Sequence, residues 1–117
     1  GKTTFTRGIM RHFGHQGATK SPTYTLVEPY QFKQQKVHHF DLYRLGHPEE
    51  LEYLGIRDYF DGCAINLIEW PDKGRGFLPN ADVVLTIHPL ERGRKLTFVA
   101  QTNMGDGVLV HLGKVKQ

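Results

Sequence analysis

The sequence predicts an α/β fold with a mixed sheet, and three observations lead to that fold class. The apolar run 64–68 ends at Glu69 and is followed by Pro71, which is typical of one buried strand. Residues 1–4, Gly-Lys-Thr-Thr, precede a segment with helical periodicity. Two pairs of alternating segments predict β-hairpins, at residues 25–32 with 37–43 and at residues 81–87 with 94–100.

The first four residues have the form of the last part of a Walker A loop, G-x-x-x-x-G-K-[ST]. In such a loop Gly1 would let the backbone approach phosphate, and Lys2 would reach the β and γ phosphates. The Thr3 hydroxyl would ligate Mg²⁺. The four residues are a weak motif alone, because the loop's first glycine would lie before Gly1.

A helix is expected over residues 3–13, where Phe5, Ile9, Met10 and Phe13 share one face. Gly14 would end it. The hydroxyl-rich segment 21–25 follows, and two interpretations stay open. Ser21 and Thr23 could belong to a switch-like loop that senses phosphate or metal, or the segment is an ordinary connection into the next strand.

In the first hairpin, Pro29 confines its strand to an edge or a bulge. Alternation in the second strand places His39 and Asp41 on one face and His38 on the other, which argues against a two-histidine metal clamp. Asp41 is an acid among apolar neighbours, so it either pairs with Arg44 or serves a site.

Glu69 stands where the buried strand ends. In a parallel sheet, ligands gather outside the carboxyl ends of strands, so this carboxylate could hold a metal ion. The alternative is a helix cap or a surface ion pair. The nucleotide hypothesis expects Lys2 and Thr3 to lie within metal-bridging distance of Glu69.

The other segments of the chain are predicted to have structural roles. A short helix is expected over residues 48–54, with another helical turn over residues 56–60. Loops are expected at residues 72–80 and 102–107, and residues 108–112 fit a strand or a helical turn equally well. Cys63 is expected to be an inert, packed thiol.

Composition predicts one soluble domain over residues 1–117, with a net charge of +3. No apolar run is long enough for a membrane helix, and the one cysteine fits a cytoplasmic location. Basic residues are scattered, which makes direct nucleic-acid binding a minor hypothesis.

Several motifs in order resemble the TsaE (YjeE) family, the small P-loop ATPases of bacterial tRNA threonylcarbamoyladenosine biosynthesis. The likeness covers residue 1 to about residue 81. The motifs are GKTT at 1–4, SPTYTLVE at 21–28, HFDLYRL at 39–45, ELEYLGI at 50–56 and IEWP at 68–71.

The resemblance implies a P-loop NTPase-like three-layer fold with mixed parallel and antiparallel strands. It implies ATP hydrolysis with Mg²⁺, with ATP and ADP as ligands, and partnership with the TsaB and TsaD proteins, through which tRNA is met indirectly. Glu69 and Asp41 would be catalytic carboxylates, and Thr3 and Glu69 would hold the metal. Thr4 would touch phosphate beside Lys2, and Trp70 would shape the site or contact a partner.

Relative to that family pattern, the N-terminal strand and most of the P-loop are absent from the chain. The chain is therefore expected to bind ATP poorly and to turn it over slowly or not at all, because phosphoryl transfer depends on positioning. Two alternatives remain open. One is a non-catalytic interaction module that docks through residues 21–28 and 70–80, and the other is a small-molecule kinase.

Overall fold

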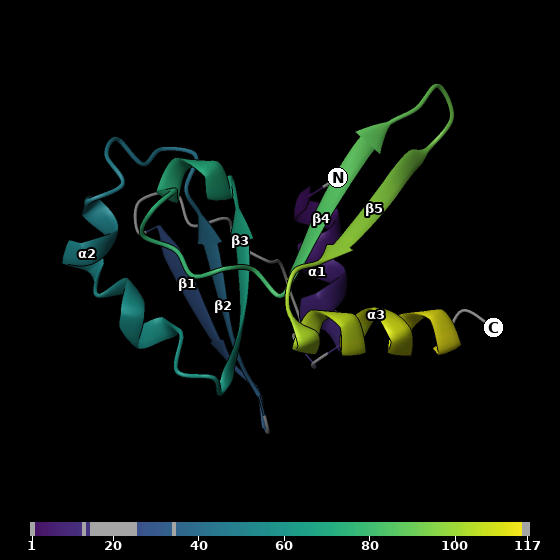
Figure 1. The fold of residues 1–117 in the computed structure, drawn as a ribbon, viewed down its shortest axis with the longest axis horizontal. Helices are drawn as coiled ribbons and strands as arrows, with labels where there is room; N and C mark the ends of the chain where they lie inside the picture. Colours follow the sequence, from purple (N-terminus) through teal and green to yellow (C-terminus); the bar gives the residue numbers. More distant parts are fainter. Residues whose placement is uncertain (1, 13, 15–25, 34, 116–117) are drawn as a thin grey trace. The chain divides into compact units, whose positions relative to one another are not determined.

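The computed structural model describes residues 2–12, 14, 26–33 and 35–115. The chain divides into two compact units, Gly1–Leu78 and Pro79–Gln117, and each is described by itself (Figure 1). The expectation of one domain stays a prediction. Within the described ranges, no helix is long and apolar enough to cross a membrane.

The first unit contains a three-stranded mixed sheet. Its strands are β1 (Val27–Gln31), β2 (Lys36–Asp41) and β3 (Ala64–Glu69), side by side in the order β1-β2-β3 (Figure 1). β1 and β2 are antiparallel, whereas β2 and β3 are parallel. The predicted hairpin and mixed sheet are confirmed, and Pro29 lies in an edge strand of this sheet, as expected.

One face of this sheet carries the hydrophobic core. The helix α2 (Glu50–Leu54) and the 3₁₀ helix η1 (Ile56–Tyr59) lie to one side of the strands (Figure 1). Phe40 is fully buried at the centre, with its ring 5.3 Å from that of Tyr59. The other buried members of this core are Val27, Leu42, Leu45, Leu51 and Ile56. Gly55, with φ of 75°, ends α2 in the left-handed conformation that glycine adopts freely.

The expected N-terminal helix is confirmed as α1 (Lys2–His12). Met10 is fully buried and Thr6 is nearly so, while Phe5 is 36% exposed. Gly14 follows with φ of 104°, and its backbone N–H donates to the carbonyl of Arg11 at 3.0 Å. The helix is therefore followed by a glycine in a left-handed conformation, as its sequence predicts.

The segment after β3 differs from the predicted loop. Residues Pro71–Gly74 form a 3₁₀ helix, η2, because Pro71 presets the backbone of its first turn. Trp70, immediately before it, has φ of 59° and ψ of 50°. This left-handed conformation is costly for a residue with a Cβ atom. Gly74 ends η2 in a buried position where an added Cβ would lie 2.7 Å from the Leu51 side chain.

Cys63 is exposed, so the expectation of a packed thiol is wrong. The residue follows Gly62, whose φ is 84°, in a turn that leads into β3. The Cys63 backbone N–H donates to the Asp61 carboxylate at 2.9 Å, and its carbonyl accepts from the Gln35 side chain at 3.1 Å. The backbone of Cys63 is thus held in a surface turn while its side chain faces solvent.

The second unit consists of a hairpin and a helix. The antiparallel strands β4 (Val83–Pro89) and β5 (Arg94–Ala100) confirm the second predicted hairpin. The helix α3 (Asn103–Val115) replaces the predicted loop at residues 102–107 and decides the open question at residues 108–112.

The start of α3 explains why the loop prediction failed. The Thr102 hydroxyl accepts from the Gly105 backbone N–H at 3.0 Å and donates to the Asp82 carboxylate at 2.6 Å, so it caps the helix. An added Cβ at Gly105 would collide with the backbone carbonyl of Asp82. Glycine is present here because it allows close packing of the helix.

Candidate functional site

Asp41 and Glu69 end neighbouring parallel strands. They are paired residues in the register of β2 and β3, so their side chains leave the same face at the same edge of the sheet. The ladder continues one step further, because the Leu42 backbone N–H donates to the Glu69 carbonyl at 3.1 Å. The structure therefore brings together the two carboxylates that the sequence selected separately.

The Asp41 side chain also shapes the chain that follows it. One carboxylate oxygen, Oδ1, accepts from the Tyr43 backbone N–H at 3.1 Å. This contact turns the backbone away as β2 ends. Asp41 is only partly buried, so its carboxylate combines a local structural contact with access to the sheet edge.

Glu69 has a buried partner, His39, that no local sequence pattern indicates. The His39 Nε2 atom lies 2.8 Å from Glu69 Oε2, with His39 2% and Glu69 12% exposed. The predicted alternation had already placed His39 on the face of Asp41. The alternation does not give the parallel register between β2 and β3. In that register Leu67 is opposite His39, and Glu69, two residues further along β3, lies on the same face as His39.

His38 lies on the opposite face and has a different environment. Its Nδ1 atom is 2.8 Å from the Asn66 side-chain oxygen, and its ring meets that of Tyr59 edge-on at 4.9 Å. The Asn66 amide in turn donates to the Tyr59 carbonyl at 3.1 Å. The two adjacent histidines therefore point apart, as the sequence predicts, and His38 joins η1 to the sheet.

Beyond the end of β3, two aromatic side chains meet at the surface. The rings of Tyr43 and Trp70 lie 5.1 Å apart with a tilt of 52°, and the side chains are 57% and 44% exposed. The Lys73 ammonium lies 5.9 Å from the centre of the Tyr43 ring. This exposed group follows directly from the strand ends that carry Asp41 and Glu69.

The remaining predicted site residues belong to the N-terminal part of the chain. Lys2, Thr3 and Thr4 form the first turn of α1, but their side chains lie outside what the structure describes. Gly1, Ser21 and Thr23 lie outside the described residues altogether. The phosphate, metal and switch roles of these residues stay predictions, as does their distance from Glu69.

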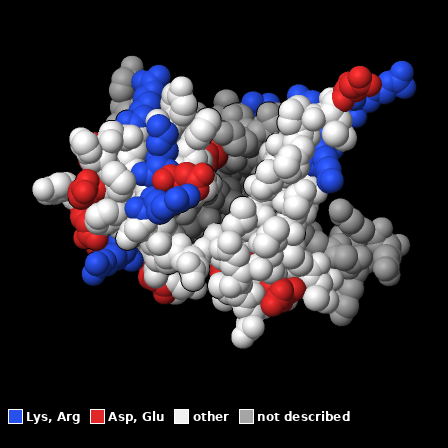
Figure 2. All heavy atoms as spheres, turned by 45° about the horizontal axis from the view of Figure 1, so that its top comes forward, with Lys and Arg blue, Asp and Glu red and all other residues white. Residues whose placement is uncertain are grey.

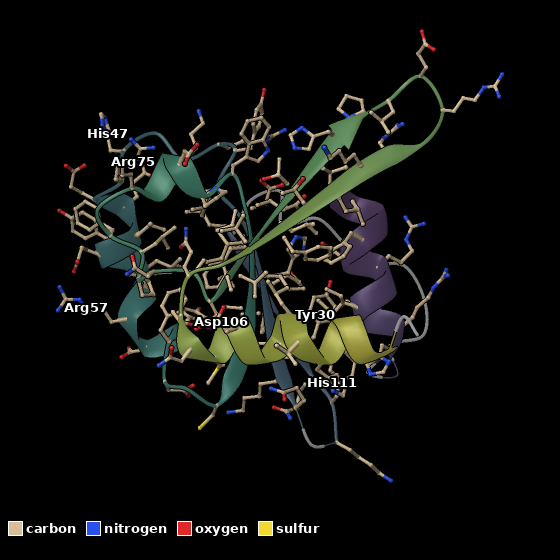
Figure 3. The ribbon with its side chains drawn as sticks, turned by 45° about the vertical axis from the view of Figure 1, so that its right-hand side comes forward. Tyr30, His47, Arg57, Arg75, Asp106 and His111 are labelled. Carbon is tan, nitrogen blue, oxygen red and sulfur yellow. The ribbon has the colours of Figure 1, made fainter. Side chains whose placement is uncertain are left out.

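Charged side chains are distributed rather than concentrated. On the face drawn in Figure 2, the described Lys and Arg side chains are interspersed with Asp and Glu. Arg57 and Arg75 extend outward from the first unit (Figure 3), and they are 85% and 82% exposed. This face gives no support for a broad basic surface of the kind that nucleic acids contact.

The carboxylates at the strand ends have the chemistry that a magnesium ion requires. Mg²⁺ prefers hard oxygen ligands and is commonly held by one or two carboxylates together with water and phosphate. In the part of the chain that the structure describes, no group of three or more His, Cys, Asp and Glu side chains could hold a metal ion by itself. Asp41 and Glu69 could supply the carboxylate ligands of a site that water and phosphate complete.

Comparison with known proteins gives a consistent result. A family model described as "Threonylcarbamoyl adenosine biosynthesis protein TsaE" matches residues 1–96. A curated protein of Haemophilus influenzae, "tRNA threonylcarbamoyladenosine biosynthesis protein TsaE", is 53% identical over 93% of this chain and 69% of its own length. The protein of the same name from Bacillus subtilis is 34% identical over 88% of this chain and 65% of its own length.

A solved structure shows the same fold. The crystal structure of YdiB from Bacillus subtilis superimposes with a TM-score of 0.74 at 28% identity, over 100% of this chain and 72% of that one. This likeness confirms the predicted P-loop NTPase-like fold. The chain spans about two-thirds of the length of its curated relatives, 69% of one and 65% of another.

Proposed function

The chain belongs to the TsaE family of threonylcarbamoyl adenosine biosynthesis proteins, and from this premise we propose that, when a complete Walker A segment precedes it, it binds and hydrolyses ATP with Mg²⁺ in that pathway. TsaB and TsaD are the proposed partners, with tRNA met through them, and the proposed location is the cytoplasm. The observation that carries the proposal is the pairing of Asp41 with Glu69 at the carboxyl ends of adjacent parallel strands.

The proposed roles follow from position and chemistry. Lys2, Thr3 and Thr4 begin α1, and the N-terminus of a helix favours bound phosphate. Glu69 would be the metal ligand or would orient the attacking water, and Asp41 would be the second carboxylate of the centre. A bound Mg²⁺ would offset the negative charge of the phosphates. Glu69 suits such a role because His39 engages one of its oxygens and no second partner of its side chain occurs among the described residues.

A non-catalytic interaction module is a second candidate, and one observation favours it. Tyr43 and Trp70 form an exposed aromatic pair, and exposed aromatic residues are enriched where proteins bind one another. The pair adjoins the strand ends, so a protein docked there would contact the same edge of the sheet. The two functions are compatible within one complex, and a nucleotide-binding measurement separates them.

The test is calorimetric titration of MgATP and MgADP. It compares the chain with the same chain preceded by a complete Walker A segment, each with and without Lys2→Ala. We expect heat of binding and Mg²⁺-dependent hydrolysis in the extended chain, and both should be lost with Lys2→Ala. Arg57→Ala is the matched control, because it also removes a basic side chain, one that is 85% exposed. Absence of binding in the extended chain would leave the interaction module as the better explanation.

A further inference from the structure

His39 is the one buried ionisable side chain in contact with the candidate centre that the proposed function leaves without a role, among the residues described. It lies on β2, two residues before Asp41, and it is only 2% exposed to solvent. A buried polar side chain is costly unless it is hydrogen-bonded. Its Nε2 atom meets that requirement through Glu69 Oε2 at 2.8 Å.

The other ring nitrogen of His39, Nδ1, has a different environment. Nδ1 is buried, and no hydrogen-bond partner for it is found in the part of the chain that the structure describes. An ionised carboxylate can only accept, so the hydrogen bond to Glu69 requires a proton on Nε2. In the neutral ring Nδ1 is then an acceptor without a proton. Among the described residues, the imidazole therefore makes its side-chain hydrogen bond to Glu69 alone.

This hydrogen bond restricts the side-chain conformation of Glu69 more than that of His39. Glu69 has three rotatable side-chain bonds and stands at a strand end, where it could adopt several conformations. The donor on His39 comes from the middle of a buried strand, whose position the sheet fixes on both sides. A bond from this donor to Oε2 holds the carboxylate in one orientation and leaves Oε1 for another ligand.

We infer that His39 is a positioning residue, whose Nε2–H orients the Glu69 carboxylate toward metal or water. The expected effect of His39 on turnover rests on the proposed function. The hydrogen bond between His39 and Glu69 does not depend on that function. Side chains that orient a metal-binding group commonly change activity or affinity by about 10- to 100-fold when replaced.

Two variants separate the effect of the His39 hydrogen bond on Glu69 from the effect of the volume that the His39 side chain fills. His39→Gln keeps an N–H donor at nearly the same reach, whereas His39→Leu fills the space without a donor. In the extended chain, we expect His39→Leu to lower kcat by about 10- to 100-fold with little change in KM for MgATP. His39→Gln should recover part of that loss. His38→Gln is the matched control, because His38 lies on the opposite face and bonds Asn66 instead.

The second measurement needs no nucleotide. Long-range ¹H–¹⁵N spectra of the chain as it stands should show a proton on His39 Nε2, and Glu69→Gln should shift that resonance. Absence of a proton at Nε2, or a resonance unaffected by Glu69→Gln, would overturn the inference whatever the turnover. Equal kcat in His39→Leu and the wild type would also overturn it. Absence of turnover in the extended wild type would refute the proposed function instead, while the spectra still decide whether His39 holds Glu69.

Discussion

Replacing Glu69 with glutamine should separate the chemical role of this side chain from its structural one. The amide has nearly the same shape, and its oxygen can still accept from His39 Nε2, which now lies 2.8 Å from the carboxylate. The substitution removes the negative charge and the strongest form of that hydrogen bond. A charge-assisted bond is about twice as strong as a neutral one.

The expected cost in stability is small. A hydrogen bond to a charged group contributes about 1.5–3 kcal/mol and a neutral one about 0.5–1.5 kcal/mol. Removing a buried charge recovers part of that difference, because Glu69 is only 12% exposed and its carboxylate is partly desolvated. We therefore expect the free energy of unfolding to fall by about 1 kcal/mol, which lowers the melting temperature by about 4 °C.

The expected cost in turnover is much larger. Loss of a group that holds metal or orients water should lower kcat by about 10²- to 10⁴-fold. A protein with about 5 kcal/mol of stability that loses 1 kcal/mol stays about 99.9% folded, so unfolding cannot produce such a fall. The assay is MgATP hydrolysis by the extended chain, well below its melting temperature, beside thermal unfolding of the same samples.

Glu52→Gln is the matched control for Glu69→Gln. The Glu52 carboxylate is 45% exposed and lies 3.4 Å from the Arg57 guanidinium, an interaction of the kind that contributes about 0–1 kcal/mol. This variant should therefore leave turnover unchanged. A Glu69→Gln protein that turns ATP over as fast as the control would refute the reasoning and return Glu69 to a structural role.

Two further predictions concern the same sheet and its core. Asp41→Asn should lower turnover by about 10²-fold or more. The fold should persist, because asparagine can also accept a hydrogen bond from the Tyr43 backbone N–H. If circular dichroism shows that the variant is unfolded, the role of Asp41 is structural. Gly74→Ala should lower the free energy of unfolding by about 1–3 kcal/mol in chemical denaturation, because the new Cβ would lie 2.7 Å from Leu51. The control Gly8→Ala lies in α1 with no atom within 4 Å of the new Cβ, and it should raise stability by about 0.5–1 kcal/mol. Similar losses in both glycine variants would contradict this account of the core.

Much of the first unit could be predicted because its signals are local. Alternation in β2 placed Asp41 on the correct face, and the abrupt end of the apolar run identified Glu69. Their shared role was implied by the family resemblance, and the parallel register of β2 and β3 places them together. What could not be predicted was the His39–Glu69 bond, because it depends on the register between strands that are 30 residues apart in sequence.

The second unit was harder to predict for a different physical reason. A loop was predicted over residues 102–107, where Gly105 and Gly107 lower helix propensity. The helix forms because Thr102 caps it and because Gly105 allows close approach to Asp82. Such a contact is a property of the folded unit, and no local pattern carries it. The roles of Lys2, Thr3 and Thr4 stay predictions, because their side chains lie outside the described residues.

The left-handed backbone at Trp70 has a consequence for protein engineering. A library randomised at this codon and selected only for heat resistance should enrich glycine and asparagine, which adopt φ near 59° at little cost. Selection of the same library for growth that depends on the pathway should instead retain tryptophan, if the ring serves the site or a partner. Enrichment of different residues in the two selections would show that tryptophan at this position lowers stability but is needed for function.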